Sequence, residues 1–163
     1  RIEEDSIVLD VGAGTGSISI EAALAAPKGH VYAIERFDKG IELIHENMNK
    51  FNVNNMTVIK SKAPEGMEDL PELDAVIIGG SAGGMTGIMD EVQRLLKVGG
   101  RLVVTAVTME TGYTILKELK GRPFTYEGYQ MSISRYRKAG PYHLLDPLSP
   151  IFIVSATRIA EGE

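Results

Sequence analysis

Three glycines at alternate positions follow a short apolar run near the start of the chain. Residues 7–11 predict a buried strand, and Gly12, Gly14 and Gly16 come directly after it. Glycine lets backbone N–H groups approach a ligand closely, and the N-terminus of the helix predicted to follow favours negative charge. The pattern therefore predicts a binding turn for a bulky polar ligand; the alternative is a tight turn without a ligand.

Two acids stand where they would select one kind of ligand. Asp10 precedes the first glycine by two residues, and Glu35 ends the second predicted strand, nineteen residues past Gly16. A carboxylate in the position of Glu35 suits the two hydroxyls of a ribose. Asp10 would repel a pyrophosphate and suit an ammonium or sulfonium group. S-adenosylmethionine carries both cations and a ribose, and the G-x-G-x-G spacing differs from the dinucleotide pattern G-x-G-x-x-G.

The elements that position these residues alternate between apolar runs and amphipathic stretches. Strands are predicted at residues 7–11, 30–35, 56–60, 73–78, 101–107, 124–136 and 151–158, and helices at 17–26, 38–50, 84–96 and 110–120, with Asp38 as a helix cap. This alternation indicates an α/β fold with a mostly parallel sheet covered on both faces, and the last two strands predict an antiparallel hairpin. We expect a doubly wound, seven-stranded, Rossmann-like sheet in a single domain over residues 1–163.

Composition excludes several classes of function. The 163 residues contain no cysteine, which rules out disulfides, thiolate metal sites and a cysteine nucleophile. The net charge of −5 argues against general nucleic-acid binding. No run is apolar for the roughly 18 residues that a membrane span needs. The three histidines lack metal-ligand spacing, so we predict no metal site. The absence of cysteine fits a cytoplasmic chain, and we predict that location.

A turn of small residues follows the fourth predicted strand. The DVGAGTG run resembles the first motif of the class I methyltransferases. Members of that class that act on amino groups carry a polar Asn/Asp-Pro-Pro-aromatic motif after the fourth strand, whereas this chain has the sequence GGSAGG at residues 79–84. Nothing in it would polarise an amine. Gly80 and Ser81 are therefore predicted to leave space for a broad substrate; the alternative is a flexible loop with no role.

These features together resemble one family closely. The stretches DVGAGTGSISIEAA, VYAIERFDKGIELIHENMNKF, KAPEGMEDLPELDAVIIGGSAGG, LLKVGGRLVVTAVTMET and SISRYRKAGPYHLLDPLSPIFIVSAT are similar to the decarboxylating precorrin and cobalt-precorrin C15-methyltransferases of cobalamin biosynthesis, which are class I S-adenosylmethionine-dependent methyltransferases. The resemblance spans almost the whole chain. Its more specific parts are GGSAGG, TAVTMET and the ISRYR run.

The resemblance implies a set of cofactor contacts. The methionine part would lie on residues 12–16, Glu35 would bind the ribose, and Ala63 would lie beside the adenine. Arg36 would stack near the adenine or remain exposed. The full cofactor set is Asp10, Gly12, Ala13, Gly14, Thr15, Gly16, Glu35, Arg36, Ala63 and Gly79. Two departures stand out: Lys62 replaces an acid that many relatives carry there, and an N-terminal segment of the relatives that covers the cofactor is expected to be missing.

The resemblance also implies the reaction and its substrate. A methyl group would pass to C15 of a precorrin or cobalt-precorrin, and the C12 acetate would lose carbon dioxide. Near-attack positioning supplies most of the first step, and the conjugated ring takes up the electrons of the second. A polycarboxylate needs cations, which the last predicted hairpin loop offers. The predicted substrate set is Gly80, Ser81, Glu110, Arg135, Arg137, Lys138 and His143, with no catalytic residue assigned. A solvated hairpin tip and helix capping by Glu110 are the alternatives.

The sequence is also compatible with other functions. The chain would be a class I methyltransferase with another acceptor, such as tRNA or a protein, or a nucleoside-binding subunit without catalysis. A nicotinamide-dependent dehydrogenase is disfavoured by the glycine spacing and Asp10. The resemblance suggests a homotetramer and a C5-methyltransferase as a possible partner, fused or separate.

Overall fold

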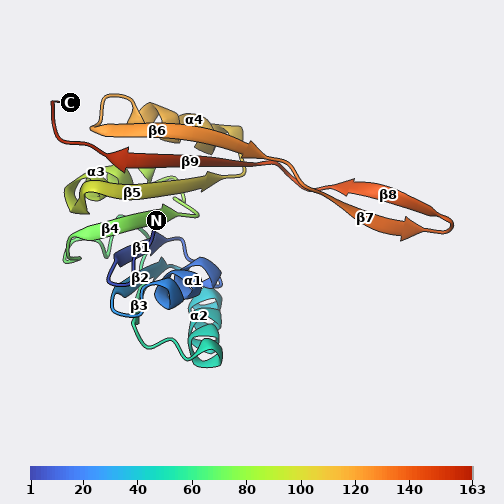
Figure 1. Ribbon diagram of the computed structural model, residues 1–163, viewed down its shortest axis with the longest axis horizontal. Coiled ribbons are helices and arrows are strands. Elements are labelled where there is room, and N and C mark those ends of the chain that lie inside the picture. The colour runs from blue at the N-terminus through green and yellow to red at the C-terminus, as the bar shows by residue number, and fades with distance from the viewer. Residues whose placement is uncertain (163) are drawn as a thin grey trace.

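A seven-stranded sheet in the order β3-β2-β1-β4-β5-β9-β6 forms the centre of the molecule (Figure 1). The computed structural model describes residues 1–162. The strands of this sheet are β1 (Ile7–Val11), β2 (His30–Glu35), β3 (Met56–Lys60), β4 (Leu73–Ile78), β5 (Leu96–Ala106), β6 (Phe124–Met131) and β9 (Ile151–Arg158). Strands β1 to β5 pair in parallel, while β9 runs antiparallel to both β5 and β6. The predicted α/β sheet with an antiparallel C-terminal pair is confirmed.

Within the described residues, four helices connect strands of the central sheet. They are α1 (Ser17–Ala25), α2 (Asp38–Phe51), α3 (Met85–Leu95) and α4 (Met109–Leu119). One apolar cluster joins the sheet to α3 and α4 through residues such as Ile88 and Ile115, and another joins it to α1 and α2 through Ile20 and Ile44. The sheet is thus covered on both faces, and its strand order reverses at β1, where ligands of doubly wound sheets bind beyond the carboxyl ends of the strands.

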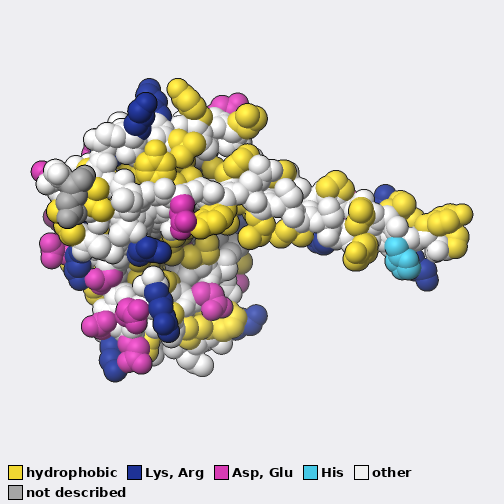
Figure 2. Space-filling view, turned by 45° about the horizontal axis from the view of Figure 1, so that its top comes forward, with side chains coloured by type: hydrophobic (Ala, Val, Ile, Leu, Met, Phe, Trp, Pro, Cys, Tyr) yellow, Lys and Arg dark blue, Asp and Glu magenta, His cyan; other side chains and the backbone are white. Residues whose placement is uncertain are grey.

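The C-terminal region differs from the prediction of one strand over residues 124–136. Strand β6 ends at Met131, and the chain then leaves the main sheet as β7 (Ser134–Ala139) and β8 (Tyr142–Pro147), which pair only with each other. This two-stranded arm projects from the body (Figures 1 and 2). The residues predicted as a loop between two strands therefore form a second small sheet.

Two smaller predictions also need correction. Strand β5 begins at Leu96, directly after α3, rather than at residue 101, and its pairing with β4 shifts register between Leu73 and Ala75. Asp38 is the first residue of α2 rather than its cap, because Phe37 occupies the cap position without a side-chain hydrogen bond. A negative charge in the first turn still suits the helix dipole.

Candidate cofactor and substrate site

Backbone hydrogen bonds hold the glycine turn, residues 12–16, between the ends of three strands. Gly12 N–H donates to Ile34 O at 2.9 Å, and Gly79 N–H donates to Val11 O at 2.9 Å. Gly12 has a φ of 73°, and a Cβ there would lie 2.7 Å from Gly80 O. Only glycine fits at this contact, which brings the turn after β1 against the turn after β4.

Glu35 fixes the turn from the end of β2. Its Oε2 accepts the N–H of Gly14 at 2.9 Å, and its Oε1 accepts the N–H groups of Arg36 and Phe37, each at 2.9 Å. The side chain is buried, yet it lines the pocket described below. A carboxylate oxygen has two lone pairs, so Oε2 retains an acceptor site for a ligand hydroxyl.

Asp10 lies beneath the glycine turn and is 1% exposed. Ser19 on α1 donates its hydroxyl to Oδ2 at 2.5 Å, while Oδ1 has no hydrogen-bond partner among the described residues. Burial raises the pKa of Asp10 to about 6, with a smaller contribution from the charge of Glu35, against the hydrogen bonds from Ser19. The expected arrangement, with both carboxylates facing the ligand, is therefore present only for Glu35.

A cavity of about 710 Å³ opens at the carboxyl ends of β1 and β2. Its wall consists of the glycine turn, Glu35, three cationic side chains and several apolar side chains. It is lined by Val11, Gly12, Gly14, Thr15, Ile34, Glu35, Arg36, Phe37, Lys39, Gly40, Leu43, Ser61, Lys62, Ala63, Gly80, Ser81 and Ala82. At Gly14 and Gly80 the space that a Cβ would occupy has no atom within 4 Å, so the backbone is open to a ligand.

The structure brings six of the ten predicted cofactor residues to this cavity. They are Gly12, Gly14, Thr15, Glu35, Arg36 and Ala63. Ala13 packs against the α1–α2 cluster, and Gly16 is buried where a Cβ would lie 2.8 Å from Ile44. Gly79 lines a neighbouring cavity, and Asp10 lies behind the turn. These four residues shape the turn rather than its exposed wall.

A second cavity, of about 290 Å³, lies at the carboxyl ends of β4 and β5. It shares Gly80, Ser81 and Ala82 with the first cavity, so the two adjoin along the turn after β4. Its other lining residues are Ile78, Gly79, Gly83, Met85, Thr105, Ala106, Val107 and Thr111. No charged side chain lines it. Gly80 and Ser81, both predicted as substrate contacts, are the residues at the junction.

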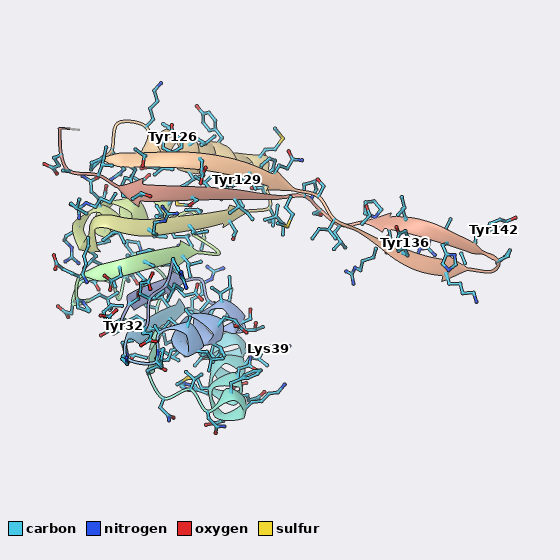
Figure 3. All side chains as sticks on the ribbon, viewed as in Figure 1. Tyr32, Lys39, Tyr126, Tyr129, Tyr136 and Tyr142 are labelled. Atoms are coloured by element: carbon cyan, nitrogen blue, oxygen red, sulfur yellow. The ribbon has the colours of Figure 1, made fainter. Side chains whose placement is uncertain are left out.

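The remaining predicted substrate residues lie elsewhere. Arg135, Arg137, Lys138 and His143 are exposed on the β7–β8 arm, which extends away from the body (Figures 1 and 3). None of them lines either cavity. Glu110 is exposed in the first turn of α4, and its neighbour Thr111 lines the second cavity instead. The cap of α4 is Thr108, whose side chain accepts Thr111 N–H.

The first turns of α2 contribute pocket residues that the sequence prediction missed. Phe37, Lys39, Gly40 and Leu43 all line the first cavity. Gly40 is needed there, because its Cβ would lie 2.8 Å from Glu35 Cγ. A signal was present in the sequence: a helix that begins directly after the acid of β2 must begin at the same sheet edge, with positions 39 and 43 one helical turn apart.

Residues 1–162 contain neither a metal-ligand cluster nor a membrane-spanning helix beside this site. Within residues 1–162 no group of three or more His, Asp and Glu side chains is placed to hold a metal ion. The same residues include no helix with the length and apolar character to cross a bilayer.

Comparison with known proteins identifies the family. The model for the precorrin methyltransferase domain matches residues 2–158. The chain belongs to the precorrin methyltransferase domain family. A Salmonella typhimurium protein named cobalt-precorrin-6B C(15)-methyltransferase (decarboxylating) is 36% identical over 159 residues, covering 97% of this chain and 82% of that protein.

Solved structures of precorrin methyltransferases share the fold. A Geobacter metallireducens precorrin-6y C5,15-methyltransferase superposes with a TM-score of 0.90 at 35% identity, covering 97% of this chain and 83% of that one. A Methanobacterium thermoautotrophicum protein described as precorrin 8W decarboxylase superposes with a TM-score of 0.88 at 28% identity, covering 96% of this chain and 83% of that one. The family match from residue 2 to residue 158 includes the glycine turn, both cavities and the arm.

Proposed function

We propose that this chain transfers a methyl group from S-adenosylmethionine to C15 of a precorrin or cobalt-precorrin, with loss of carbon dioxide from the C12 acetate. Family membership over nearly the whole chain is the observation that carries this proposal. The names of the relatives supply the reaction: cobalt-precorrin-6B C(15)-methyltransferase (decarboxylating) appears for proteins of Salmonella typhimurium and, with "probable", of Sulfurisphaera tokodaii. The chain is accordingly an enzyme, a decarboxylating C-methyltransferase.

The first cavity fits S-adenosylmethionine. Its volume of about 710 Å³ lies within the roughly 300–1,000 Å³ of small-molecule sites. Gly12, Gly14 and Thr15 would hold the methionine part, Oε2 of Glu35 would accept from a ribose hydroxyl, and Ala63 would lie beside the adenine. The wall carries three cations, so its charge alone does not select a sulfonium over a phosphate. The choice of cofactor follows from the family.

Positioning is what these residues contribute to methyl transfer. The bound cofactor supplies an electrophilic methyl group. Glu35 is fixed by three backbone N–H groups, so it would orient the nucleoside without a change of its own conformation. The junction of Gly80 and Ser81 lies between the two cavities, and this is where the acceptor carbon would meet the methyl group.

Self-association is the second part of the proposal. Tyr136 and Tyr142 lie on the arm (Figure 3). They are 79% and 70% exposed, and Leu145 is 66% exposed. An isolated two-stranded hairpin is marginal in water, so the arm needs a partner surface. Arg135, Arg137 and Lys138 against the one acid Asp146 give residues 134–147 a charge of +2, leaving −7 for the rest of the chain. This complementarity supports a second copy as the partner, in a homotetramer.

The arm offers cations, whereas no charged residue lines the second cavity. We predict that substrate carboxylates contact the cations of the arm, Arg135, Arg137, Lys138 and His143. An arm that reaches a neighbouring copy would bring these cations to the substrate site of that copy.

A C5-methyltransferase partner and a cytoplasmic location also remain predictions. A nucleoside-binding subunit without turnover is the alternative function that the experiment below addresses.

Two measurements test the proposal. Calorimetry should show binding of S-adenosylmethionine and none of NAD; the reverse result would end the cofactor assignment. Incubation with a precorrin, followed by mass spectrometry, should show one methyl group gained and one carbon dioxide lost. Cofactor binding with an unchanged macrocycle would support the binding-subunit alternative.

A further inference from the structure

The second cavity differs from the first in its charge. Four charged residues, Glu35, Arg36, Lys39 and Lys62, line the first cavity, whereas the second has none. Its polar side chains are the hydroxyls of Ser81, Thr105 and Thr111. The wall is otherwise backbone, glycine and apolar side chains such as Ile78 and Met85. A substrate rich in carboxylates thus meets one uncharged compartment directly beside the cofactor cavity.

Hydrogen bonds leave Thr111 ready to donate. Thr108 Oγ1 accepts the backbone N–H of Thr111 at 3.2 Å and lies 3.0 Å from Thr111 Oγ1, to which its own hydroxyl donates. With Thr108 as donor, Thr111 Oγ1 accepts in this pair, which leaves its own hydrogen available to a ligand in the cavity that Thr111 lines. Thr105 differs, because its Oγ1 lies 3.5 Å from Ile78 O and is directed at the backbone of β4. Thr111 is the donor best placed for a ligand in this cavity.

We propose that the uncharged cavity is the subsite for the carboxylate arm that the substrate loses, with Thr111 and Ser81 donating hydrogen bonds to that carboxylate. This inference rests on the proposed function and specifies where its second step occurs. An arginine or lysine at this place would stabilise the carboxylate as an ion pair and oppose its departure. Neutral hydroxyls orient the group while leaving it weakly stabilised, and the product, carbon dioxide, is apolar and uncharged.

The chemistry balances without a further reactant. The bond between the arm's methylene carbon and its carboxyl carbon breaks, and the carboxyl group leaves as carbon dioxide. The bonding electron pair passes into the conjugated ring, where it neutralises the positive charge that the incoming methyl group brings. A proton then shifts within the ring system to the methylene carbon, so no oxidant, reductant or added base is needed.

The test separates carbon dioxide loss from methyl gain. Single-turnover reactions with a precorrin are analysed by mass spectrometry for Thr111→Val, Thr111→Ser and Thr111→Lys. In T111V we expect carbon dioxide loss to slow by about tenfold relative to methyl gain, because the hydroxyl that orients the carboxylate is absent. T111K should slow it further, since the lysine would hold the carboxylate, and T111S should restore the wild-type ratio. Thr114→Val, one turn along α4 and outside the cavity lining, is the matched control.

The outcomes distinguish this inference from the proposed function. A methylated product that retains its carboxylate in T111V, but not in T114V, supports the subsite. An unchanged ratio of the two rates in T111V, or an equal fall of both rates, overturns it while the proposed function stands. If the wild-type chain itself neither methylates nor decarboxylates a precorrin, the proposed function fails and the inference falls with it. Circular dichroism of each variant shows whether the fold is retained.

Discussion

Ser19 on α1 donates its hydroxyl to Oδ2 of Asp10 on β1 across 2.5 Å, directly beneath the glycine turn. Both side chains are buried, and Oδ1 of Asp10 has no hydrogen-bond partner within residues 1–162. Burial of a carboxylate with one unpaired oxygen favours its neutral form, which explains why the pKa is raised to about 6. The turn that lines the first cavity is therefore supported by a carboxyl group whose pKa is raised to about 6.

This pairing predicts a pH-dependent stability difference between the wild type and Asp10→Asn. The folded-state pKa of about 6 lies above the ordinary value of 3.8, so the folded chain binds this proton more tightly than the unfolded chain. Stability from Asp10 therefore falls as pH rises through that interval. Urea unfolding should show D10N gaining up to about 3 kcal/mol over the wild type between pH 4 and pH 7. A stability difference between D10N and the wild type that does not change with pH would contradict a raised pKa at Asp10.

Cofactor binding should release protons from the same group. A cation held above the turn lowers the pKa of Asp10, so binding of S-adenosylmethionine near pH 6 should displace part of a proton. Calorimetry in two buffers of different ionisation enthalpy measures that release directly. D10N is the control, and it should release fewer protons. Equal proton release by both chains would show that another group responds to the ligand.

The position of Asp10 shows what a residue pattern leaves out. The sequence identified both acids and the glycine turn, but side chains alternate along a strand. Val11 lines the cavity, so Asp10 points to the opposite face and reaches α1. Counting along β1 could have indicated this. The alternation of side chains along a strand does not direct Glu35 away from the cavity, because Glu35 is the last residue of β2 and lies beside the turn.

The sheet was predictable because burial dictates its pattern. Leu9, Val31 and Val76 are fully buried in strands that are mainly apolar, as is typical of parallel strands covered on both faces. The arm was not predictable in the same way. Tyr136 and Leu145 lie opposite each other in its register yet are largely exposed, so no core of this chain selects their conformation. Their structure depends on pairing between β7 and β8 and on whatever surface covers them.

Substitution of Gly12 tests the contact between the two turns. Gly12→Ala would place a Cβ 2.7 Å from Gly80 O at a φ of 73°, so both steric overlap and backbone strain oppose it. We expect a loss of about 2–4 kcal/mol in the free energy of unfolding and no cofactor binding. Gly14→Ala is the matched control: its φ is 59° and no atom lies within 4 Å of its Cβ. Strain alone should cost it about 1–2 kcal/mol.

The same pair separates two roles of the turn. If G12A and G14A lose the same stability, the Gly12–Gly80 contact is not a structural constraint. Because the Cβ of G14A enters the cavity, this variant should bind S-adenosylmethionine more weakly in calorimetry even when its fold is intact. If G14A binds S-adenosylmethionine as tightly as the wild type, the methionine part of the cofactor does not lie against Gly14.

Charged substitutions on the arm should dissociate the proposed homotetramer without unfolding the body. Tyr136 and Leu145 are cross-strand neighbours on one face of the arm, so Tyr136→Glu with Leu145→Glu places two charges where an apolar partner surface is required. We expect sedimentation velocity to show a smaller species for this double variant, with thermal unfolding of the central sheet little changed. Leu24→Glu, an exposed apolar position of α1 outside the arm, should keep the wild-type mass. If the double variant sediments like the wild type, self-association through the arm is ruled out; if L24E also dissociates, the contact surface extends to the body.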